Sequence, residues 1–129
     1  MNFITLRSLL AVALLLAALL AAASAQAAGS PKRFKGYAVE LPRETAPYAP
    51  ETGDVVVAET AAHALIHQTG FVGPACATGQ YLLIYKKRKT WREVDTGTCD
   101  DRGFTAQLKS DRLIFTLRGK PMAIYPLYE

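Results

Sequence analysis

The chain contains two cysteines, Cys76 and Cys99, and their positions constrain its fold more than any other feature. The midpoint between them falls in a charged stretch that separates two strand-like segments, 81–85 and 91–94. A hairpin centred on that midpoint would bring the cysteines face to face at its open end, as disulfide geometry requires. Both segments are recognisable from their own composition, without reference to the cysteines. The coincidence therefore predicts a Cys76–Cys99 disulfide that closes a two-stranded ribbon.

The alternatives to a structural disulfide have little support in the residues. A redox pair would normally form a CxxC motif, and a zinc site needs a third and fourth ligand at suitable spacing; the sequence has neither. A disulfide closing a loop of this length would stabilise the fold by about 3 kcal/mol in the chain-entropy model. For a small domain that is a large share of the total stability.

The N-terminal segment predicts export. Arg7 is followed by an uncharged run rich in Leu and Ala at 9–23, and then by small residues that allow cleavage after Ala25 or Ala27. A retained membrane helix needs about 20 strongly apolar residues, and this run is shorter, with a weakly apolar, Ala-rich end. We therefore expect residues 1–27 to be a cleavable signal peptide. The mature protein would be periplasmic or secreted, with no membrane span, in a compartment where disulfides persist.

The rest of the chain divides by composition into two parts. Residues 28–53 contain four prolines and one short strand-like run, 37–41, which predicts an extended tether or strap. Residues 54–129 have the texture of a β domain, with β-branched and aromatic runs between turn residues. The stretch 60–68 is ambiguous, because its alanines also suit a helix. We favour a strand there, since strand-like segments follow it.

Alternation of apolar residues predicts a three-stranded meander at the C-terminal end. A turn at Ser110-Asp111 pairs Leu108 with Leu113, Ala106 with Phe115 and Phe104 with Leu117, all on one face. A second turn at Gly119-Lys120 would pair Leu117 with Met122, Phe115 with Ile124 and Leu113 with Pro126. Pro126 cannot donate a ladder hydrogen bond, which places the last strand at a sheet edge.

These elements together predict an all-β, mainly antiparallel fold. The segment 81–85 is apolar on both faces, so we expect a central strand that is covered on each side. The overall expectation is a small disulfide-stapled sandwich or partly open barrel of about six to eight strands, ending in the meander.

The residues argue against several enzyme classes. Beyond residue 27 the only serines are Ser30 and Ser110, and neither lies in a Gly-x-Ser-x-Gly context. A disulfide would remove both cysteines as nucleophiles. No phosphate-binding glycine loop and no dinucleotide fingerprint is present. We therefore expect a non-enzymatic protein without a cofactor.

One alternative is a metal-binding or small enzymatic domain that uses Glu59, His63 and His67. On a helix these three side chains would form a row at a spacing of four residues and could gather around one ion. On a strand four residues span about 13 Å, which is too far for one ion. If no metal is bound, we expect two half-exposed histidines that face solvent.

Acidic residues offer two weaker hypotheses. Glu93 and Asp95 alternate onto one strand face, at a separation that a glycosidase pair could use. Asp95, Asp100 and Asp101 faintly suggest an oxygen-rich cation loop, without the regular alternation of a calcium motif. Solvent-facing strand residues and ordinary turn chemistry explain the same pattern.

The one dense charge cluster is Lys86-Lys87-Arg88-Lys89, at the predicted hairpin tip between Tyr85 and Trp91. Such a tip could bind an acidic protein or an anionic glycan or envelope surface. Equally, charges at a tip keep an apolar ribbon soluble and discourage edge pairing. The whole chain carries a net charge of only +4, too mild for a dedicated nucleic-acid binder, so we expect no nucleic-acid partner.

The leading expectation is an exported, non-enzymatic binding domain that presents the basic loop to an acidic partner. The binding residues would be Lys86, Lys87, Arg88 and Lys89, with Tyr85 and Trp91 beside them. In size, export, β texture and disulfide the chain resembles small periplasmic inhibitor or immunity proteins. That resemblance is one of type, with no shared motif, and it transfers no residues. A structural component of the envelope is a third hypothesis.

Overall fold

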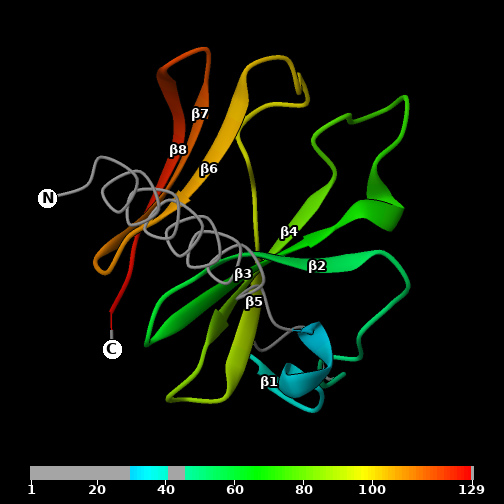
Figure 1. Ribbon diagram of the computed structural model, residues 1–129, viewed down its shortest axis with the longest axis vertical. Coiled ribbons are helices and arrows are strands. Elements are labelled where there is room, and N and C mark those ends of the chain that lie inside the picture. Colours follow the sequence, from blue (N-terminus) through cyan, green and yellow to red (C-terminus); the bar gives the residue numbers. More distant parts are fainter. Residues whose placement is uncertain (1–29, 41–45, 129) are drawn as a thin grey trace, which may run out of the picture.

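The computed structural model describes residues 30–40 and 46–128. Its regular secondary structure is strand, apart from two short 3-10 turns (Figure 1). The elements are η1 (Pro31–Phe34), β1 (Ala38–Val39), β2 (Asp54–Glu59), β3 (His63–Gln68), η2 (Thr69–Phe71), β4 (Gln80–Tyr85), β5 (Thr90–Val94), β6 (Phe104–Leu108), β7 (Arg112–Leu117) and β8 (Lys120–Pro126). The predicted signal peptide lies outside the described residues. Within them, no helix is long and apolar enough to cross a membrane.

The strands form two sheets. The first has the order β1-β5-β4-β3-β2, and the second is the meander β6-β7-β8 (Figure 1). All neighbours are antiparallel except β1 and β5, which run parallel. The all-β, mainly antiparallel prediction is therefore confirmed. The described strands form an open two-sheet structure, and they do not close into a barrel.

The β4–β5 hairpin has the predicted register. Tyr81 pairs with Val94 and Tyr85 with Thr90, so the turn is centred between residues 87 and 88. Cys76 and Cys99 form the predicted disulfide at the open end, with their Cα atoms 4.5 Å apart. The disulfide therefore continues the register of the strand pairs: the two cysteines are equally far from the centre of the turn.

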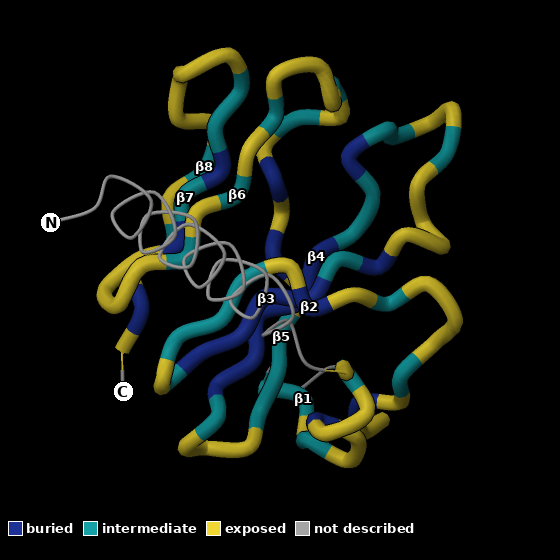
Figure 2. Tube along the Cα trace, in the orientation of Figure 1, coloured by how far each residue is buried: buried dark blue, intermediate teal, exposed yellow. Residues whose placement is uncertain are grey.

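Both faces of β4 are covered, as the sequence predicted. Leu83 and Phe115 are fully buried on the side that faces the meander. On the other side Leu82 and Ile84 pack against Phe34, at the N-terminal end of the described chain. Figure 2 shows these buried segments running through the middle of the molecule. The five-stranded sheet is thus the central layer, between the meander and the segment before β2.

That segment contributes directly to the core. Phe34 in η1 and Tyr48 are each 3% exposed and pack on the five-stranded sheet. The N–H of Gly36 donates to the carbonyl oxygen of Tyr48 at 2.8 Å, which ties the segment together. Within the strand-like run 37–41, the structure has the two-residue strand β1 beside β5.

The ambiguous stretch 60–68 contains β3, so the preference for a strand is confirmed. β3 lies between β2 and β4, and four of its six residues are buried in succession. His63 is 1% exposed, so the expectation of two half-exposed histidines was wrong for it. Its place inside a central strand, packed edge-on against the Tyr85 ring, explains the burial.

The first meander hairpin has the predicted pairs, but the register of the second was wrong, by two residues at the turn, where Leu117 pairs with Lys120, and by one residue beyond the bulge. The turn is Arg118-Gly119, where both residues have positive φ, and a bulge lies between Phe115 and Thr116. Phe115 therefore pairs with Ala123 instead of Ile124. A shift of one residue reverses the faces of a strand, so Met122 and Ile124 point outward, 40% and 56% exposed. β8 does lie at a sheet edge, as predicted.

Candidate functional site

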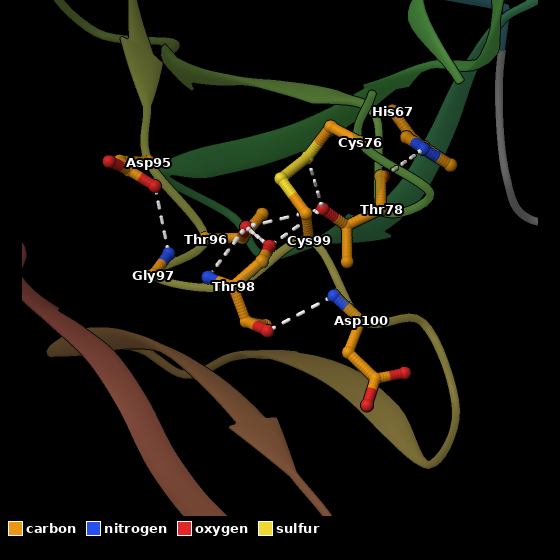
Figure 3. The surroundings of a disulfide bond; sticks show 9 residues. All are labelled: His67, Cys76, Thr78, Asp95, Thr96, Gly97, Thr98, Cys99 and Asp100. Atoms are coloured by element: carbon orange, nitrogen blue, oxygen red, sulfur yellow. Dashed lines mark hydrogen bonds between the residues drawn. A yellow bond between two sulfur atoms is a disulfide. The ribbon is translucent and has the colours of Figure 1, made fainter. Parts of the chain in front are cut away.

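The β4–β5 hairpin carries a distinct surface at each end. At its open end the ladder stops at the Tyr81–Val94 pair, and the chain then loops on both sides until the disulfide joins it. Three threonines hold these loops together (Figure 3). The Thr78 hydroxyl donates to the carbonyl oxygen of Thr98 at 2.8 Å, and the Thr96 hydroxyl donates to the same oxygen at 2.5 Å. Because Thr78 and Thr96 are buried, the network is shielded from water.

A hollow of about 630 Å³ lies beside this network. We call it the disulfide hollow; its lining residues are Phe71, Cys76, Gly79, Gln80, Glu93, Val94, Asp95, Thr96, Gly97, Thr98 and Cys99. The two acidic residues that the sequence singled out, Glu93 and Asp95, both line the hollow. Sequence reasoning missed Phe71, in η2, and Gln80, at the start of β4, because only the folded chain brings them beside the open end of the hairpin.

The sequence also proposed a cation loop at Asp95, Asp100 and Asp101, which the structure gives turn roles. Asp95 accepts from the N–H of Gly97 at 2.8 Å, and Asp100 from the N–H of Arg102 at 3.0 Å. Asp100 also pairs with Arg118, and these hydrogen bonds lower the pKa of its carboxyl. Across the described residues, no three His, Cys, Asp or Glu side chains are grouped to hold a metal ion.

The opposite end of the hairpin is the basic tip, defined here as Lys86, Lys87, Arg88 and Lys89. Its four side chains fall into two classes. Lys86 forms an ion pair with Glu59 at 2.5 Å, and Arg88 forms one with Glu40 at 2.6 Å while stacking 4.2 Å above the Tyr85 ring. Lys87 and Lys89 are exposed and make no ion pair within the described part of the chain.

Arg33, in η1, joins the basic tip through a shared carboxylate. Its guanidinium donates two hydrogen bonds to Glu59, one of them 2.8 Å long, and the same carboxylate also pairs with Lys86. The hydrogen bond from Arg33 is the main cause of a lowered pKa at Glu59, and Lys86 adds to it. With Arg33 included, the described residues at this end comprise five basic side chains and two acidic ones.

The two aromatic residues beside the tip are largely structural. Tyr85 is 6% exposed and belongs to the core that faces the meander, and the guanidinium of Arg88 lies over its ring. Trp91 is partly buried on the opposite sheet face, edge-on to the ring of Tyr48. The exposed part of the predicted binding site is therefore its basic side chains.

The residues of the metal alternative are separated and engaged elsewhere. Glu59 ends β2, whereas His63 and His67 lie on β3, a strand rather than the helix that this hypothesis needed. The Nε2–H of His67 donates to the carbonyl oxygen of Thr78 at 2.9 Å, and its ring stacks on Tyr81 at 4.4 Å. Glu59 is held by Arg33 and Lys86.

No protein-family model, no curated protein and no solved structure matches this chain. The two ends of the stapled hairpin are therefore the features from which a function can be inferred.

Proposed function

We propose that the protein is an exported, non-enzymatic binding domain that holds a polyanionic partner at its basic tip. The observation that carries the proposal is that some basic side chains of this end form ion pairs and others do not. Arg33, Lys86 and Arg88 are fixed by Glu59 and Glu40, whereas Lys87 and Lys89 stay exposed between them. A partner would thus meet two exposed ammonium groups on a framework that is already ordered.

Such an arrangement reduces the entropy lost on binding. Immobilising a long side chain costs about 0.5–1.5 kcal/mol, and here Lys86 and Arg88 are ordered before the partner arrives. The ion pairs do not neutralise the surface, because five basic side chains face two acidic ones. The remaining positive charge would steer an anionic partner toward this end.

Binding of two defined polyanions tests the proposal. Heparin represents a sulfated glycan and poly-glutamate represents an acidic protein surface, each measured by biosensor at low salt. Replacing Lys87 and Lys89 with Gln should weaken binding by up to about thirtyfold, since each of the two lost contacts is worth about 1 kcal/mol or less. The variant Lys109→Gln/Lys120→Gln is the matched control, because it removes the same charge from exposed positions on the meander.

The control variant should retain nearly the original affinity for both polymers. A preference for heparin would assign the partner to the glycans, and a preference for poly-glutamate would assign it to acidic proteins. Equal losses in the two double variants would show that only net charge matters and would contradict the proposal. Absence of binding to either polymer would contradict it as well.

A further inference from the structure

The disulfide hollow has the size and the preorganisation of a small-molecule site. Its volume of about 630 Å³ lies within the range of about 300–1,000 Å³ that is usual for ligand pockets. Its walls are fixed by the Cys76–Cys99 bond and by the hydrogen bonds of Thr78 and Thr96 to Thr98 (Figure 3). Since all these contacts are made within the chain itself, the walls need no ligand to hold their shape.

The charges at the hollow have one sign. Among the described residues, its lining includes the acidic residues Glu93 and Asp95 and no lysine, arginine or histidine. Asp95 uses one carboxylate oxygen to accept from Gly97, while the side chain of Glu93 makes no hydrogen bond or ion pair within residues 30–40 and 46–128. Both residues are exposed at the rim. A positively charged group would therefore be attracted and an anion repelled.

An aromatic ring completes the hollow. Phe71, from η2, is 53% exposed and belongs to neither core cluster. A large apolar side chain left in solvent at the edge of a cavity offers a surface for the apolar part of a ligand. Its ring face also attracts cations, which agrees with the sign of the nearby carboxylates.

We propose that the disulfide hollow binds an organic cation, an ammonium or guanidinium group carried on a short apolar stem. Glu93 and Asp95 hold the positive charge, and Phe71 covers the stem. A free amine and the side chain of a lysine in a peptide share this chemistry. The site lies at the opposite end of the hairpin from the basic tip and does not depend on it.

Titrations followed by protein NMR test this site, with benzylamine as the free amine and an acetylated, amidated Gly-Lys-Gly peptide as the side-chain source. Benzyl alcohol is the uncharged control. We expect saturable binding of at least one cation, with shifts centred on residues of the hollow, and much weaker binding of benzyl alcohol. Binding of the amine alone would indicate a small-molecule ligand, and binding of the peptide alone would indicate a protein ligand.

Substitution of the carboxylates separates this proposal from general attraction. Glu93→Gln/Asp95→Asn should weaken cation binding about tenfold, and the new amide side chain at the second position keeps an oxygen that can cap Gly97. Glu51→Gln, at an exposed acid outside the hollow, should leave cation binding unchanged. Equal affinity for benzyl alcohol, shifts that map elsewhere, or no saturable binding of either cation would overturn the proposal.

Discussion

Gly97 lies so close to Met122 that a Cβ atom added to Gly97 would sit 2.6 Å from the carbonyl oxygen of Met122. This contact joins the loop of the disulfide hollow to β8, the edge strand of the other sheet. Gly97 also has a φ of +76°, a conformation that residues with side chains rarely adopt. Close approach and backbone conformation therefore both require glycine at this position.

We predict that Gly97→Ala destabilises the protein much more than Gly119→Ala. Both glycines have positive φ, so each substitution costs about 1–2 kcal/mol in backbone strain. Only Gly97 adds a steric clash, worth about 1–3 kcal/mol more, because nothing lies within 4 Å of a Cβ added to Gly119. Urea denaturation measures the difference, and equal midpoints for the two variants would contradict the contact.

The register of the β7–β8 hairpin determines which face of β8 is buried, and this can be tested by substitution. We predict that Ile124→Ala changes the free energy of unfolding by less than about 1 kcal/mol, because Ile124 is 56% exposed. Tyr125→Ala should cost more, about 2–3 kcal/mol, because Tyr125 is partly buried against the core. The Tyr125 ring lies edge-on to Phe115, and its hydroxyl donates to the carbonyl oxygen of Asp95 at 2.6 Å. A larger loss of stability in Ile124→Ala than in Tyr125→Ala would contradict this register and support the one expected from the sequence.

The ion pairs of Glu59 predict a specific pH dependence. The pKa of Glu59 is lowered in the folded state, chiefly by the hydrogen bond from Arg33. A lowered folded-state pKa adds stability that is present above the unfolded value, which is about 4.5, and is lost as the pH falls through the folded value. Glu59→Gln should therefore cost about 1 kcal/mol at neutral pH and progressively less below pH 4.5.

Denaturation of wild type and Glu59→Gln across this pH range gives the comparison. Glu51→Gln is a suitable control, because Glu51 is exposed and forms no ion pair within the described residues. A cost for Glu59→Gln that stays constant from neutral to acidic pH would show that the carboxylate charge is not the cause.

The sequence predicted those parts of the fold in which local patterns agree with one another. The midpoint of Cys76 and Cys99 and the apolar alternation around it specify a single hairpin register. The turn between β6 and β7 is equally well specified, because a slip would bring Thr105 and Gln107 inward. In these cases tertiary contacts reinforce what the pattern already favours.

Other features depend on information that no local pattern holds. A two-residue turn with glycine second requires positive φ at Arg118, and the bulge beyond it shifts the ladder again, so the position of Gly119 alone was misleading. Arg33 reaches Glu59 across 26 residues because η1 packs on the sheet. The disulfide hollow is formed by loops, whose shape depends on three threonines that do not resemble a motif.

The most direct test of the account is the number of free thiols in the protein purified from its native host without reductant. Alkylation under denaturing conditions without reductant, followed by intact mass measurement, gives this number, and a reduced sample provides the control. With Cys76 and Cys99 bonded, the protein should gain no alkyl groups before reduction and two after it. Two alkyl groups on the unreduced protein would mean that the hairpin is open, and the hollow and the rigid display of the basic tip would both lose their basis.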